Sequence, residues 1–249
     1  MMGRKRDIIV AGLILLGLWE IAALVLNSMA LPQPWIVLID VFQKVADGSL
    51  IDDLLISSVR ALLGIFLALI TAVPLGLLIG AEEPLRKRLS PFIYLLYPVP
   101  HVVLLPLIII LFGIGNFSKI FLIALIVFFQ ILVTTRDAAK NIHQNYYYSM
   151  QTLGASRLQV YFHVILPASL PKILTAMRIS IGTAVAILFF VESFATTRGL
   201  GYIIMDSWGR ADYTALYTGI FCMALLGFSL YLILDRLERR LCRWTEIDK

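Results

Sequence analysis

The chain has 249 residues, of which 60% are hydrophobic and only 15% are charged, with a formal net charge of +5. Soluble globular domains carry about 25% charged residues, so this composition excludes a soluble domain. The apolar residues form continuous blocks rather than alternating strands, which excludes a membrane β-barrel. Backbone amides find no water in lipid and must pair within helices. The sequence therefore predicts an all-α integral membrane protein in contact with the lipid bilayer.

Six apolar blocks have the length of membrane-spanning helices, for which about 20 residues are needed. The first block follows the basic stretch Arg4-Lys5-Arg6 and resembles a signal peptide. Because it is long and carries Trp19-Glu20, an uncleaved helix is expected. We expect one membrane domain over residues 1–249. The predicted spans are residues 8–26, 61–81, 92–112, 120–135, 173–191 and 213–234.

Residues 27–58 form the longest connection on the predicted outer side. There, Pro32-Gln-Pro34 predicts an extended turn, and residues 37–46 are amphipathic enough for a short interfacial helix. The sequence Gly113-Ile-Gly-Asn-Phe-Ser-Lys119 lacks the glycine that precedes the lysine of a phosphate-binding loop. We interpret it as a hairpin turn between two spans.

Lysine and arginine residues are unevenly divided between the two sides of the predicted membrane domain. Cytoplasmic loops carry an excess of these residues, so their distribution predicts orientation. Six spans with both termini in the cytoplasm place most of them inside and explain the net charge without a nucleic-acid partner. The inside residues are Arg4, Lys5, Arg6, Arg86, Lys87, Arg88, Arg136, Lys140, Arg157, Lys172, Arg236, Arg239, Arg240 and Arg243.

The predicted cytoplasmic segment 141–171 has features of a docking element. Pro167 and Pro171 restrict where helices can run and predict a break before the fifth span. Leu153 and Val160 lie on one partly apolar helical face, and Gly154 permits a turn between helical pieces. The pattern favours a short helix that lies along the membrane and enters a cleft of a partner. A plain interfacial loop helix is the alternative.

This segment resembles the signature loop of the permease subunits of bacterial ABC importers. The family pattern is Glu-Ala-Ala, three residues, Gly, nine residues, Ile-x-Leu-Pro. The chain has Gly154 and, after the same nine-residue gap, Val164-Ile-Leu-Pro167. Tyr148-Ser149-Met150 stands in place of Glu-Ala-Ala, so a salt bridge of the family's glutamate is not carried over. The residues that this resemblance assigns to coupling are Ser149, Met150, Leu153, Gly154, Ala155, Ser156, Arg157 and Pro167.

Further short matches, in the same order and around the same six-span topology, extend the resemblance over most of the chain. They are similar to the subgroup that takes up nitrate, sulfonates, taurine, bicarbonate and thiamine precursors. The matching stretches are Trp19-Glu20, Pro98-x-Pro100, Leu105-Pro106, Phe112-Gly-Ile-Gly115, Ser118-Lys119 and Gly199-Leu-Gly-Tyr-Ile203.

The resemblance implies a type I importer permease fold in the bacterial inner membrane, without an enzymatic activity of its own. It implies two ABC ATPase subunits, which bind ATP and Mg²⁺, and a periplasmic or lipid-anchored solute-binding protein. No cofactor or metal is expected in this chain. Since no second permease half is fused to it, a homodimer is the first expectation.

Ionisable residues inside spans are costly and are candidates for function. For Glu20, beside Trp19, a packing role is favoured, whereas Arg178 either extends toward the cytoplasm or lies near an inner gate. His101 follows Pro98 and Pro100, where proline rings predict a break in the helix. It either faces the pathway or is a hydrogen-bonded buried histidine.

Glu192 ends the fifth predicted span and precedes several hydroxyl groups and an arginine. Such a cluster is suited to a small anion at the outer mouth of the pathway, and a solvated loop is the alternative. The arginine favours anions such as sulfonate or nitrate, with a thiamine-precursor-like compound as the other expected substrate class. The cluster comprises Glu192, Ser193, Thr196, Thr197 and Arg198.

The resulting hypothesis is solute import by alternating access, driven by partner ATPases and without covalent chemistry in this chain. A self-sufficient secondary transporter or channel is the rival, but it leaves segment 141–171 unexplained. A membrane-embedded enzyme is a third alternative, which lacks any clustered catalytic set in this sequence.

Overall fold

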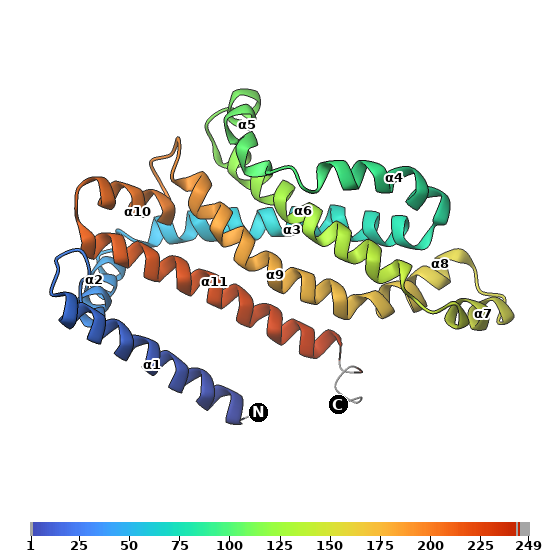
Figure 1. Ribbon diagram of the computed structural model, residues 1–249, viewed down its shortest axis with the longest axis horizontal. Helices are drawn as coiled ribbons and strands as arrows, with labels where there is room; N and C mark the ends of the chain where they lie inside the picture. The colour runs from blue at the N-terminus through green and yellow to red at the C-terminus, as the bar shows by residue number, and fades with distance from the viewer. Residues whose placement is uncertain (1, 243, 245–249) are drawn as a thin grey trace. The chain divides into compact units, whose positions relative to one another are not determined.

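The computed structural model describes residues 2–242 and 244, with side chains from residue 6 onward. The side chains of Arg4 and Lys5, and all of Arg243, therefore lie outside the described part of the chain. The described residues form helices and no strand (Figure 1). The elements are α1 (Met2–Leu26), α2 (Pro34–Ala46), α3 (Ile51–Ala81), α4 (Glu83–Leu96), η1 (His101–Leu104), α5 (Leu105–Phe112), α6 (Asn116–Lys140), α7 (Gln144–Thr152), α8 (Arg157–Val160), η2 (Tyr161–Ile165), α9 (Leu166–Glu192), α10 (Leu200–Gly209) and α11 (Tyr213–Leu241).

Within the described residues, five helical stretches are long and apolar enough to cross a membrane. A sixth span results if α4 and η1–α5 count as one, although they are bent by 77°. The third predicted span, 92–112, is thus not one straight helix, because the missing amides and the rings of Pro98 and Pro100 interrupt it. The five stretches are Arg6–Leu26, Ile51–Ala81, Asn116–Lys140, Arg157–Glu192 and Tyr213–Leu241.

One prediction about the fifth span was wrong. Pro167 and Pro171 do not break the chain before it, because the helix continues from Arg157 to Glu192. The turn directly before Pro167 is the π-helical segment η2. A π turn shifts the hydrogen-bonding register, so a proline can follow it without the clash and lost bond of a regular α-helix. The helix therefore accommodates Pro167 instead of ending there.

The chain divides into two compact units, the first of which comprises residues 1–57 and 192–225. In this unit the ring of Trp19 on α1 lies 5.6 Å from the ring of Tyr217, and its indole nitrogen donates to the Pro32 carbonyl (3.0 Å). On α2, Asp40 accepts hydrogen bonds from Lys44 (2.7 Å) and Thr218 (2.6 Å). These contacts fix the C-terminal half of α1 and helix α2 within the first unit, while most of α1 exposes apolar side chains suited to lipid.

The second unit comprises residues 58–191 and 226–249. Helices α3 and α6 approach closely in it, because three glycines on α3 face α6. A Cβ atom on Gly80 would lie 2.4 Å from the carbonyl oxygen of Arg136, and similar contacts occur at Gly64 and Gly76. Small residues at helix interfaces allow such close backbone packing in membranes. The pair forms the centre of this unit, with Ile123 and Ile131 fully buried.

Candidate functional site

Helices α7 and α8 form a hairpin beyond the ends of α6 and α9 (Figure 1). At the turn, the amide of Ala155 donates to the Met150 carbonyl (3.0 Å) and that of Gly154 to the Gln151 carbonyl (2.9 Å). This pair of bonds is the Schellman arrangement, which requires a left-handed residue after the helix. Gly154 supplies it with φ = 69°. The glycine thus sets the shape of the turn.

Residue Ser156 begins α8 with a capping box. Its amide donates to the side chain of Gln159 (2.7 Å), and the Gln159 amide donates back to the Ser156 hydroxyl (3.4 Å). At the start of α7, the amide of Asn145 donates to the His143 ring (3.3 Å). Reciprocal capping satisfies amides that the first turn of a helix leaves unpaired. Both short helices are therefore fixed by local bonds.

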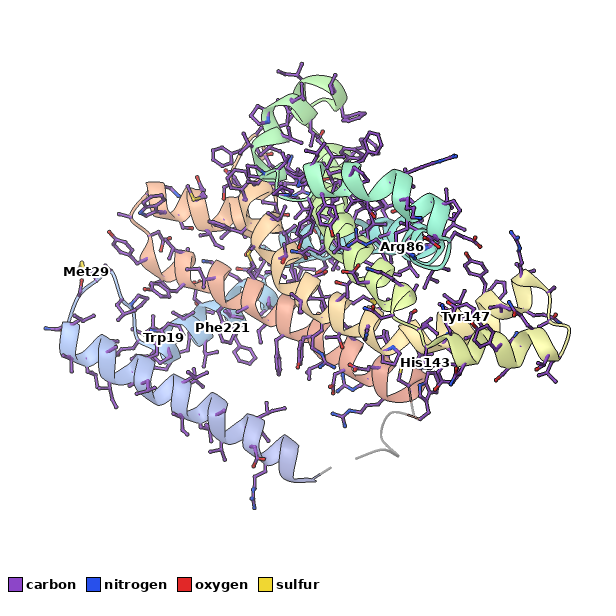
Figure 2. All side chains as sticks on the ribbon, turned by 45° about the vertical axis from the view of Figure 1, so that its right-hand side comes forward. Trp19, Met29, Arg86, His143, Tyr147 and Phe221 are labelled. Atoms are coloured by element: carbon purple, nitrogen blue, oxygen red, sulfur yellow. The ribbon has the colours of Figure 1, made fainter. Side chains whose placement is uncertain are left out.

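The base of the hairpin is anchored in a buried core cluster. Tyr147 from α7 and Val160 from α8 pack against buried side chains that include Ile165. Figure 2 shows Tyr147 on α7 and His143 directly before it, near the end of the hairpin that joins the long helices. Burial, and to a smaller degree the charge of Glu82, raise the pKa of the Tyr147 phenol. The hairpin is thus packed onto its unit at one end.

Away from this core cluster, the hairpin exposes large apolar side chains. Leu153 is 79% exposed and Leu158 is 68% exposed, and both tyrosines that flank Tyr147 are exposed as well. The apolar face expected from the sequence is therefore divided, since Val160 packs inward while Leu153 and Leu158 point outward. We call Tyr146, Tyr148, Leu153 and Leu158 the exposed hairpin face. Exposed apolar groups of this kind typically mark an interaction surface.

His101 begins η1, directly after the break at Pro98 and Pro100. Its ring stacks on Phe129 of α6, with 4.6 Å between the ring centroids and an angle of 27°. Both prolines are exposed, and His101 is half-buried. The structure thus places His101, directly after the predicted break, against Phe129 of α6.

A polar group between α6 and α9 was not identified from the sequence. The amide nitrogen of Gln130 donates to Thr183 (3.1 Å), and its oxygen accepts from Ser180 (3.1 Å). These bonds join two spans across the interior of the second unit. Gln130 alone could have been found, since it is the polar residue in an otherwise apolar run.

The structure separates Glu192 from the rest of its predicted cluster. Its side chain is 0% exposed and accepts hydrogen bonds from the Ser57 hydroxyl (2.8 and 2.9 Å) and the Gly201 amide (3.0 Å). In the following loop, Thr196 bonds to the backbone of Arg198. The exposed side chains of this loop include Thr197 and Arg198, and Ser193 is half-buried.

Arg178 of α9 is paired with acidic residues of α11. Its guanidinium bonds to Glu238 and lies 3.9 Å from Asp235. It also lies over the ring of Tyr231, 5.6 Å from the centroid. Arg178 therefore joins two helices within the second unit.

The described residues contain no group of three or more histidine, cysteine or acidic side chains that could hold a metal ion.

Comparison with known proteins agrees with this architecture. The family model "Binding-protein-dependent transport system inner membrane component" matches residues 64–243. The taurine transport system permease protein TauC of Escherichia coli (strain K12) is 38% identical over 232 residues, which cover 91% of this chain and 84% of that protein. The formylaminopyrimidine transport permease protein ThiX of Halalkalibacterium halodurans is 28% identical over 240 residues, 94% of each chain.

A solved structure has the same fold at low sequence identity. It is the MetNI methionine ABC transporter in inward-facing conformations, with a TM-score of 0.67 and 20% identity. The match covers 77% of this chain and 95% of that one. The chain belongs to the binding-protein-dependent transport system inner membrane components, the multi-pass permease subunits of ABC importers, in which ATP hydrolysis takes place on a separate subunit.

Proposed function

We propose that this chain forms half of the transmembrane pathway of an ATP-driven importer and moves its solute by alternating access. Two copies form the pathway, two ABC ATPase subunits bind ATP and Mg²⁺ below it, and an external binding protein delivers the solute. The observation that carries the proposal is the α7–α8 hairpin, which is fixed at its base and exposes apolar side chains at its tip.

The charge distribution supports a cytoplasmic position for the hairpin. Arg86, Lys87 and Arg88 follow α3, and Arg136 and Lys140 end α6, just before the hairpin begins. The positive-inside rule assigns such loops to the cytoplasm. The same rule places both termini there and puts α2, α10 and the loop before α10 on the outer side.

The exposed hairpin face is suited to a hydrophobic cleft of an ATPase. Coupled motion requires a rigid element, and the two capped helices with the Gly154 turn provide one. The coupling role extends to Ser149, Met150, Leu153, Gly154, Ala155, Ser156, Arg157 and Pro167. Of these, Leu153 supplies most apolar contact area, while Gly154 and Ser156 maintain the shape of the turn.

The solute is proposed to be a small sulfonate-type anion or a thiamine-precursor-like compound. The names of two relatives, taurine and formylaminopyrimidine permeases, support these two classes. Taurine carries a sulfonate, for which Arg198 and the hydroxyls of Ser193, Thr196 and Thr197 are suitable partners at the outer mouth. Pro98, Pro100 and His101 are the candidates within the pathway.

Purification of the chain from its native operon, followed by reconstitution into vesicles, tests the proposal. An ATPase is expected to co-purify in stoichiometric amount, and uptake is expected to require ATP and the binding protein. A chain that purifies alone and moves solute in ATP-free vesicles would instead be a secondary transporter or channel.

A further inference from the structure

The N-terminus of the outer helix α10 is held by side chains from two other helices. The amide of Gly199 donates to Asp53 (2.6 Å), and the amide of Leu200 donates to the Ser57 hydroxyl (2.8 Å). The next amide, of Gly201, donates to Glu192, as described above. The first amides of a helix have no partner within it. Here three successive amides are satisfied by α3 and by the last residue of α9.

Glu192 is at the centre of this arrangement. Its carboxylate accepts from both Ser57 and Gly201, while the Ser57 hydroxyl in turn accepts from Leu200. A fully buried carboxylate is stable only where it has hydrogen-bond donors. The positive end of the helix dipole adds further stabilisation at this position. Glu192 is thus bound to α10 through its own bond and through the shared hydroxyl.

Gly199 allows the carboxylate to reach this position. Its φ of 115° lies in a region that other residues rarely adopt. A Cβ atom at this position would lie only 2.5 to 2.7 Å from the carboxyl atoms of Glu192. The backbone and the carboxylate are therefore in direct contact, and any side chain at residue 199 would separate them.

The helix that ends at Glu192 starts at the proposed coupling hairpin. Helical structure runs without interruption from Arg157, in α8, to Glu192. We infer that Glu192 is a positioning residue whose carboxylate makes α10 move with the outer end of α9. The inference rests on the proposed function, because the hairpin at the other end of this stretch receives the ATPase motion. Movement of α10 together with α9 then depends on this carboxylate.

Limited proteolysis of the detergent-purified full chain measures how firmly α10 is held. Trypsin can cleave after exposed Arg198, next to α10, once that backbone opens locally. We expect cleavage there to be about tenfold faster in Glu192→Ala, because charge-assisted hydrogen bonds are lost. Glu192→Gln should be intermediate. Asp206→Asn, which removes a carboxylate at the other end of α10, should match the wild type.

Gly199→Ala tests whether the contact itself is responsible. When Glu192 is present, Gly199→Ala should strongly accelerate cleavage at Arg198. When Glu192 is already replaced by alanine, the added Cβ has no carboxylate to clash with, so Gly199→Ala should accelerate cleavage much less. Equal effects in both backgrounds, or wild-type cleavage in Glu192→Gln, would overturn the inference. Rapid cleavage at Arg86–Arg88 would show that Glu192→Ala does not fold. In that case the rate of cleavage at Arg198 in Glu192→Gln and in Ser57→Ala tests the inference instead.

The reconstituted complex gives the functional readout. Glu192→Gln should reduce ATP hydrolysis stimulated by the binding protein about tenfold while leaving the unstimulated rate unchanged, which a merely unfolded permease would not do. Normal stimulation in Glu192→Gln would refute the positioning role. A wild-type chain that recruits no ATPase would contradict the proposed function, yet the proteolysis would still report on Glu192.

Discussion

Leu153→Ala provides a direct test of the exposed hairpin face. Leu153 lies in the turn between α7 and α8, and its side chain is 79% exposed. The turn is held by backbone bonds to Met150 and Gln151, which the substitution leaves in place. Exposed substitutions of this kind usually change stability by about 0.5 kcal/mol or less. We therefore expect the permease to fold normally and any effect to arise in partner binding.

The expected loss in affinity follows from the apolar area removed. The substitution deletes three carbon groups, each worth about 0.8 kcal/mol when buried. Only the exposed 79% of the Leu153 side chain can still be buried by a partner, so the loss of binding free energy is about 2 kcal/mol. Since 1.4 kcal/mol corresponds to a factor of ten, the ATPase should bind roughly 25-fold more weakly.

Titration of the purified ATPase onto the detergent-solubilised permease measures this affinity. Thermal unfolding of the same sample confirms that the variant is folded. Leu111→Ala on α5 is the matched control, because Leu111 is similarly exposed (65%) but lies away from the hairpin. If Leu153→Ala bound the ATPase as tightly as Leu111→Ala, the exposed hairpin face would not be the docking surface.

Three other substitutions test separate features of the chain. Gly154→Pro cannot adopt a φ of 69° and loses an amide donor, so it should abolish uptake while membrane abundance, measured by immunoblot, is unchanged. Gly80→Val should overpack α3 against α6, which costs about 1–3 kcal/mol of stability and lowers the melting temperature in detergent. Gly12→Val is the control, because a side chain at residue 12 meets no other atoms and should leave the melting temperature unchanged. Arg178→Ala and Glu238→Ala should destabilise the permease non-additively, with a coupling of about 1 kcal/mol in a double-mutant cycle of thermal stabilities.

Hydropathy predicted which parts of the chain are helical, but it underestimated their length. The predicted spans 61–81 and 120–135 lie within α3 and α6, which extend to Ile51–Ala81 and Asn116–Lys140. A polar residue ends the apolar stretch that hydropathy detects, whereas the helix itself continues for as long as its backbone amides and carbonyls can form hydrogen bonds. The polar extensions matter here, since the first turns of α3 carry Asp53 and Ser57.

The hairpin could be predicted because its determinants are local. Gly154 marks the turn and Ser156 the start of the next helix, within a few residues of each other. The prediction of a break at Pro167 was wrong because a π turn, which depends on backbone register, has no distinct sequence signal. The direction in which Val160 and Leu158 point likewise depended on the core packed beneath them.

The role of Glu192 could not be predicted because its partner is distant in sequence. Ser57 and Glu192 are 135 residues apart, and no periodicity relates them. The sequence shows an acid near hydroxyls and an arginine, a pattern that equally fits an anion site. Only the structure reveals that the acid is fully buried against helix amides while the arginine is exposed.

Three polar side chains, one fully buried and two half-buried, each connect one helix to another. Glu192 connects α9 to α3 and α10, Gln130 connects α6 to α9, and Arg178 connects α9 to α11. All three sets of contacts include α9, the helix that continues from the proposed coupling hairpin. In a membrane, where apolar packing alone does not favour one helix pair over another, such bonds determine which helices move together. These contacts join α9 to its neighbouring helices, and under the proposed alternating access we expect them to carry the motion of α9 to those helices.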